Sequence, residues 1–277
     1  MRIPVNIQLA WSVAFVLLFT DAYSQDTIRL KNYFRELKTI NVSIGGKTYD
    51  FLFDTGGGET FISPAIAEDL KKDVYGRVTG TRMNGEKVYY KKCDSVTIVM
   101  SHTEMFHTSL GIWDVMSVLP KELPRIDGVI SLKSFNDKVI SINLARNWII
   151  IETKASYRKK LKSMVLLNSR FASGQNGNEL TVFLGILHSR RLYWFLFDTG
   201  NITDFIMSSQ TAHDWGLQNK ADSVNNDFHS VAIPLGRQEL SVAASIRDII
   251  YDGALNYNVI CKGDYVLDLV GKKVWLK

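Results

Sequence analysis

The sequence lacks the features that would tie it to a membrane, a metal or a nucleic acid. After the first 24 residues, no run approaches the about 20 apolar residues that a membrane-spanning helix needs. His102 and His107 have neither an HExxH motif nor a cysteine partner beside them. The 33 Lys and Arg residues, against 28 Asp and Glu, are scattered along the chain. We therefore expect no metal, no cofactor, no nucleic-acid partner and no membrane insertion of the mature chain.

Cysteine is scarce as well. Cys93 and Cys261 are the only two, and they come from opposite halves of the chain. A disulfide between the halves is one interpretation, because such bonds persist in oxidising compartments. Two unpaired thiols are the other, because one pair shows no spacing typical of a disulfide framework.

The first 24 residues have the pattern of a secretory signal peptide. Met1-Arg2 supplies a positive start, residues 9–19 are apolar, and Ala22-Tyr23-Ser24 places small residues before a cleavage site. The pattern predicts an exported chain, periplasmic or secreted, that begins at Gln25. An uncleaved membrane anchor is the alternative.

The sequence does contain an internal repeat. FLFDTGG at Phe51–Gly57 returns as FLFDTGN at Phe195–Asn201, and nine of the 14 positions around it are identical at an offset of 144 residues. IDGVIS at Ile126–Ser131 matches YDGALN at Tyr251–Asn256 at an offset of 125 residues. Since 277 residues exceed the usual single core, we divide the chain into lobes at 25–155 and 179–277, joined by a linker at 156–178.

Each half predicts mostly β structure. Two strands flank a turn at Gly45-Gly46 before the first Asp-Thr-Gly, and Ser63-Pro64 begins a short helix after it. Asn84-Gly85 lies between two extended arms, which is typical of a hairpin. Each half closes with another hairpin, and the segment at 155–178 is the expected connection.

The paired motifs, Asp-Thr-Gly after an apolar strand and a later Asp-Gly before two apolar residues, resemble the retropepsin and pepsin-like aspartic proteases. The specific resemblance is to exported bacterial members with two such lobes in one chain, and it covers nearly the whole mature sequence. It implies an all-β, bilobal acid-protease fold, with two β-barrel-like lobes and short helices related by a pseudo-twofold axis. It also implies an aspartic endopeptidase that hydrolyses peptide or protein substrates as a monomer.

The resemblance assigns roles to individual residues. Asp54 and Asp198 are the expected catalytic pair, sharing one proton and activating a water. The residues expected to support the pair are Thr55, Gly56, Thr199 and Gly200. The hairpin with Gly80, Asn84 and Gly85 is the expected flap, with a shorter counterpart at residues 229–238. The second motif is Asp127-Gly128 in the first lobe and Asp252-Gly253 in the second.

The sequence departs from the family where a glycine usually follows the second motif's apolar pair. Ser131 and Asn256 hold these positions. A positive φ at Ser131 would strain its backbone. The alternative function is therefore a weak or inactive pseudoprotease that binds peptides or cell-envelope partners in the interlobe cleft.

Overall fold

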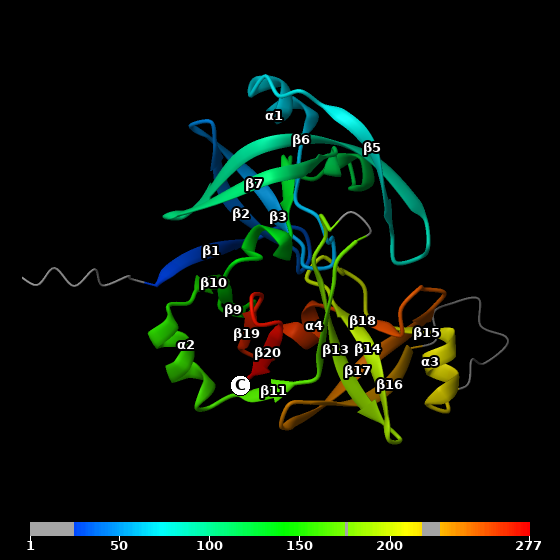
Figure 1. Ribbon diagram of the computed structural model, residues 1–277. Coiled ribbons are helices and arrows are strands. Elements are labelled where there is room, and N and C mark those ends of the chain that lie inside the picture. Colours follow the sequence, from blue (N-terminus) through cyan, green and yellow to red (C-terminus); the bar gives the residue numbers. More distant parts are fainter. Residues whose placement is uncertain (1–24, 175–176, 218–227) are drawn as a thin grey trace, which may run out of the picture.

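The computed structural model describes residues 25–174, 177–217 and 228–277, so the predicted signal peptide lies outside the described residues. Figure 1 shows two lobes, the first above the second, with a sheet that joins them. No helix in the described ranges is both long enough and apolar enough to cross a membrane. The bilobal, mostly β architecture confirms the predicted fold class.

The first lobe has ten strands and short helices. They are β1 (Asp26–Asn32), β2 (Lys38–Ile44), β3 (Lys47–Phe53), β4 (Phe61–Ile62), α1 (Pro64–Asp69), β5 (Tyr75–Thr81), β6 (Lys87–Met100), β7 (Thr103–Ile112), η1 (Val115–Val118), β8 (Gly128–Ile130), η2 (Leu132–Phe135), β9 (Val139–Asn143) and β10 (Trp148–Ile151). As predicted, β2 and β3 form a hairpin, and Gly45 and Gly46 adopt the positive φ angles that its turn needs.

The rest of the chain repeats part of this arrangement after a connecting segment. The elements are α2 (Lys154–Leu161), β11 (Val165–Leu167), β12 (Ser169–Ala172), β13 (Thr181–His188), β14 (Arg191–Phe197), β15 (Phe205–Ser208), α3 (Ser209–Asp214), β16 (Phe228–Leu235), β17 (Gln238–Arg247), β18 (Gly253–Leu255), α4 (Tyr257–Ile260), β19 (Tyr265–Asp268) and β20 (Lys273–Leu276). The segment predicted as a linker contains ordered elements. Within it, β11 pairs with β20 and β12 with β13, so it extends two sheets.

The Asp-Gly motif packs tightly against the strand that ends in each Asp-Thr-Gly. Strand β8 lies between β3, which is parallel to it, and β4, which is antiparallel. A Cβ on Gly128 would lie 2.3 Å from the carbonyl oxygen of Phe61 and 2.4 Å from the ring of Phe51. Gly253 is packed in the same way against Phe195. Only glycine fits at these positions, and the buried strands β3 and β14 therefore end at fixed points.

Six neighbouring strands of a 13-stranded sheet, in the order β1-β10-β9-β19-β20-β11, join the lobes (Figure 1). At the centre of these six, β9 pairs antiparallel with β19, and Ser141 lies opposite Val266. These two residues are equivalent in the repeat, because they differ by the offset of 125 residues. The pseudo-twofold axis therefore passes between them.

The two cysteines lie in different lobes and are both free thiols. Cys93 is buried on β6, whereas Cys261 directly follows α4. Of the two sequence interpretations, the structure has the unpaired thiols.

Candidate active site

Asp54 and Asp198 stand at the ends of equivalent strands, β3 and β14, at the junction of the lobes. Backbone N–H groups of the following residues hold each carboxylate. Gly56 and Gly57 donate to Oδ1 of Asp54 at 2.9 and 3.0 Å, and Gly200 donates to Oδ1 of Asp198 at 2.9 Å. The predicted pair is thus brought together by the fold.

Two threonines tie the aspartate loops to each other across the axis. The backbone N–H of Thr55 donates to Oγ1 of Thr199 at 3.0 Å, and that of Thr199 donates to Oγ1 of Thr55 at 3.0 Å. Each hydroxyl also donates to the opposite strand, from Thr55 to the carbonyl of Phe197 and from Thr199 to the carbonyl of Phe53. All four bonds are buried, so the two loops are held as one unit.

The glycines of the two motifs leave room for the opposite carboxylates. A Cβ on Gly200 would lie 2.6 Å from Cγ of Asp54. The equivalent position in the first lobe, Gly56, packs in the same way against Asp198. Each loop therefore completes the wall around the other lobe's aspartate.

The pKa values of the Asp54 and Asp198 carboxyls depend on each other. Burial raises the pKa of both carboxyls, and the adjacent charge of Asp54 raises the pKa of Asp198 further. Backbone N–H groups of the two turns oppose this rise in the pKa at both carboxyls. The pair therefore titrates as a unit and holds one shared proton over a range of pH.

The hairpin of β5 and β6 forms as predicted and reaches the second lobe. Its turn is closed by a bond from the N–H of Gly85, which has a φ of +83°, to the carbonyl of Arg82, and by Asn84 Oδ1 accepting from the N–H of Glu86. At the tip, the carbonyl of Met83 accepts from the N–H of Ile250 at 3.0 Å. The Met83 side chain packs against a second-lobe cluster that contains Leu196, Ile206 and Ala254.

The predicted flap counterpart at residues 229–238 is wrong. Those residues belong to the β16–β17 hairpin, and β17 pairs parallel with β15 as β7 does with β4. The β16–β17 hairpin is therefore equivalent to β6–β7, not to β5–β6. Among the residues that the structure describes in the second lobe, no hairpin corresponds to the flap. The two kinds of hairpin look alike in sequence, because each is a turn between extended arms. The parallel pairing of the second strand shows which hairpins are equivalent.

The aspartates of the second motif do not join the predicted catalytic pair. Asp127 accepts from Nε of Arg125 at 2.8 Å, and Asp252 accepts from the backbone N–H of Trp194 at 2.7 Å. Their carbonyls accept from the N–H groups of Ser63 and Ser208, the N-caps of α1 and α3. Their role is to join strands and helices behind the site.

Ser131 and Asn256 are unstrained. Their φ angles are −100° and −117°, and each residue caps the short helix that follows. Each also bonds to the loop after its lobe's Asp-Thr-Gly. Ser131 Oγ donates to the carbonyl of Gly58 at 3.0 Å, and Asn256 Nδ2 donates to that of Thr203 at 2.7 Å. The departure from glycine therefore adds anchors to both aspartate loops.

Sequence reasoning missed a buried charged group beside the first aspartate loop. Glu59 is 2% exposed and contacts Tyr90 and Lys92 on the flap strand β6. The repeat contains one signal of it: Glu59 aligns with the neutral Thr203, so the first lobe has a charge where the second has none.

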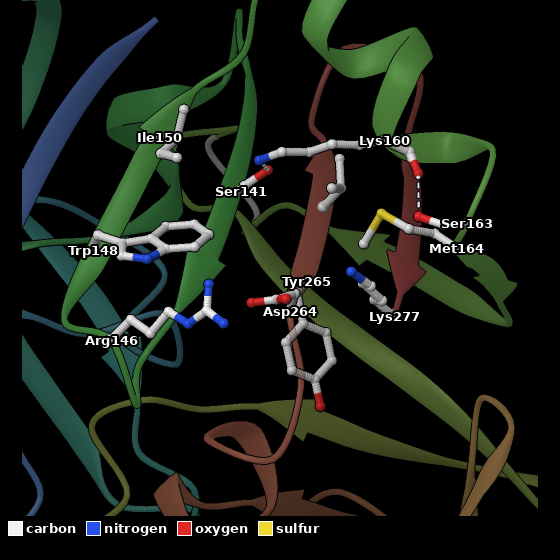
Figure 2. Close-up of a pocket in the computed structure, with 11 residues that line it drawn as sticks. Ser141, Arg146, Trp148, Ile150, Lys160, Ser163, Met164, Asp264, Tyr265 and Lys277 are labelled. Carbon is white, nitrogen blue, oxygen red and sulfur yellow. Dashed lines mark hydrogen bonds between the residues drawn. The ribbon is translucent and has the colours of Figure 1, made fainter.

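A pocket of about 250 Å³ lies away from the aspartates, on the sheet that joins the lobes. Figure 2 shows Arg146 and Trp148 on one side of it, Lys160 and Met164 on the other, and Asp264 between them. None of the predicted site residues lines it.

The comparisons with known proteins agree with this geometry. Residues 40–130, which contain both motifs of the first lobe, match the family model described as aspartyl protease. The first lobe is therefore similar to aspartyl proteases in sequence. Two similar solved structures are basic 7S globulin from soybean, with a TM-score of 0.55, and conglutin gamma from lupine seeds, with a TM-score of 0.57. Each is 10% identical, and each match covers 92% of this chain and 95% of the other. No curated protein sequence matches the chain.

Proposed function

We propose that this protein is an active aspartic endopeptidase that hydrolyses peptide bonds with a water activated between Asp54 and Asp198. The observation that carries the proposal is the intact catalytic frame. Both carboxylates are present, and the reciprocal bonds of Thr55 and Thr199 hold their loops together.

The charge of Asp54, which raises the pKa of Asp198, favours a division of roles between the two carboxyls. Ionised Asp54 is the general base, which takes a proton from the water as the water attacks the scissile carbonyl carbon. Protonated Asp198 is the general acid, which hydrogen-bonds to the carbonyl oxygen as negative charge develops there. Water attacks directly, so no acyl-enzyme forms.

The flap supplies the cover that such a reaction needs. In the described conformation its tip at Met83 is bonded to Ile250 of the second lobe. We propose that this contact opens to admit an extended peptide and closes again over it, excluding bulk water from the aspartates.

The proposed setting is outside the cytoplasm, on the signal-peptide pattern of the first 24 residues. The substrate is a peptide or protein. One chain contributes both aspartates, so we propose that the monomer is active.

A second candidate is a pseudoprotease that binds peptides or cell-envelope partners without cutting them. The docked flap tip favours it, since the tip is bonded to the second lobe in the described conformation. The two similar structures are also described as globulins. The unstrained backbone at Ser131 and Asn256 removes the sequence argument for this alternative.

Digestion of a diverse peptide library, from acid to neutral pH, tests the proposal. The wild type should generate new peptide termini by mass spectrometry, whereas the isosteric variants Asp54→Asn and Asp198→Asn should not. A wild type that cleaves no better than Asp54→Asn, while still binding peptides, would establish the pseudoprotease instead.

A further inference from the structure

Glu59 connects the first aspartate loop to the flap strand. Both of its carboxylate oxygens are occupied by side chains of β6, since Lys92 forms an ion pair with Oε1 and the Tyr90 hydroxyl donates to Oε2 at 2.7 Å. The Lys92 and Glu59 side chains are only 5% and 2% exposed. Tyr90 and Lys92 are two residues apart on the strand, so their side chains lie on the same face, toward Glu59.

The loop that carries Glu59 is anchored on its other sides as well. Thr60 Oγ1 lies 2.7 Å from Oγ of Ser134 in the helix after β8. The carbonyl of Gly58 accepts from the N–H of Leu180 in the second lobe at 2.9 Å. The loop is therefore bonded to the interior of the first lobe and to the second lobe, and Glu59 bonds it to the flap strand as well.

The repeat shows that this carboxylate accompanies the flap. At the equivalent position of the second lobe, Thr203 bonds within its own loop, with its hydroxyl donating to Oδ1 of Asn201 at 2.6 Å. No flap is present among the described residues of that lobe. The lobe with the flap has the carboxylate, and the lobe without a described flap has a neutral residue.

The energetics of a buried ion pair favour a geometric role over a stabilising one. An apolar pair of the same size often gives equal or greater stability, because desolvating two charges is costly. The pair does penalise any arrangement that separates its members, since a lone buried charge is strongly unfavourable. The phenol of Tyr90 remains a donor, because burial and the neighbouring Glu59 raise its pKa.

We propose that Glu59 is a positioning residue: through Lys92 and Tyr90 it fixes the flap strand relative to the loop of Asp54, so that the flap tip reaches Ile250. This effect on the position of the flap does not depend on whether the protein cleaves peptides. Only its consequence for peptide cleavage rests on the proposed function.

The test uses a neutral replacement of the pair in the full chain. Glu59→Gln with Lys92→Met removes both charges and leaves side chains of similar length. The matched control is Glu152→Gln with Lys160→Met, which removes another ion pair with a buried carboxylate, at the sheet that joins the lobes. The readout is hydrogen exchange at the amide of Ile250, the donor to Met83 at the flap tip.

Exchange at Ile250 should be about tenfold or more faster in the Glu59–Lys92 double variant than in the wild type, and unchanged in the control. A double variant that melts near the wild type and retains wild-type exchange at Ile250 would overturn the proposal. If the double variant fails to fold, Tyr90→Phe, which removes only a hydroxyl, is judged by the same readout.

Kinetics then separate this inference from the proposed function. If the wild type cleaves peptides, the double variant should lose at least about tenfold in kcat/KM with a change in both kcat and KM, as expected when a covering element is displaced. If the wild type cleaves nothing, the endopeptidase proposal fails, and exchange at Ile250 still decides the role of Glu59.

Discussion

Gly56 of the first lobe lies directly against the carboxylate of Asp198 in the second, and a Cβ on Gly56 would stand 2.3 Å from Cγ of Asp198. Gly56→Ala should therefore displace one aspartate from the other. Because misplacing a reacting group by about 1 Å costs on the order of a hundredfold, kcat/KM should fall by about that factor or more. Peptide cleavage by the folded variant is the measurement.

The control for this prediction is Gly177→Ala, which strains the backbone at a φ of +68° but adds a Cβ that would meet nothing within 4 Å. Its kcat/KM should stay close to that of the wild type. Equal cleavage by Gly56→Ala and the wild type would contradict the packing of Gly56 against Asp198.

The reciprocal threonine bonds should contribute to stability as well as to the site. Thr55→Val keeps the shape of the side chain but removes the hydroxyl, which donates to Phe197 and accepts from Thr199. Leaving those buried groups unpaired should lower the free energy of unfolding by about 1–3 kcal/mol. Thr55→Ser retains the hydroxyl and should lose much less. Equal denaturant midpoints for the Val and Ser variants would show that these bonds contribute nothing.

The raised pKa of Asp198 predicts a pH-dependent gain in stability on its neutralisation. Its folded pKa lies above the ordinary value of 3.8, so the folded state binds the proton more tightly than the unfolded state. The free energy of unfolding of the wild type must therefore fall as pH rises from 3.8 through the raised pKa. Asp198→Asn lacks this loss, and its advantage over the wild type in thermal melts should grow from acid toward neutral pH. An advantage that is constant over this range would contradict the shift.

His107 should lower the free energy of unfolding as pH falls, whereas Asp198 lowers it as pH rises. Burial lowers its pKa from 6.5 to about 4, with a smaller contribution from Lys133. The unfolded state therefore binds the proton first, and the free energy of unfolding should fall by about 3 kcal/mol as pH drops from 6.5 to about 4. His107→Leu should remove this acid sensitivity in denaturant unfolding, whereas His102→Leu, at an exposed position, should retain it. If both variants keep the wild-type pH dependence, another group is responsible.

The repeat in the sequence was sufficient to predict the two-lobed architecture and the aspartate turns. The offset of 144 residues relates Thr55 to Thr199, which bond to each other across the two lobes. These predictions succeeded because both lobes use the same strand, turn and glycine packing, which local sequence determines.

Other features depend on pairings that sequence does not express. Glu59 and Lys92 are 33 residues apart in sequence, and charged residues are mostly exposed, so nothing local indicated that they form a buried pair. The equivalence of β16–β17 to β6–β7 rests on the parallel pairing of β17 with β15. The backbone at Ser131 is extended because its side chain caps η2, a contact that required the fold to be known.

The catalytic pair is tested most directly by the affinity of a peptide inhibitor with a hydroxyl-bearing tetrahedral carbon, of the statine type, in place of the scissile carbonyl. Titration calorimetry should compare it with the same peptide lacking that hydroxyl. The wild type should bind the hydroxyl compound at least about tenfold more tightly, because the hydroxyl occupies the position of the water between Asp54 and Asp198. Asp54→Asn and Asp198→Asn should lose most of this difference. Equal affinities of the wild type for the two compounds would contradict an assembled catalytic pair.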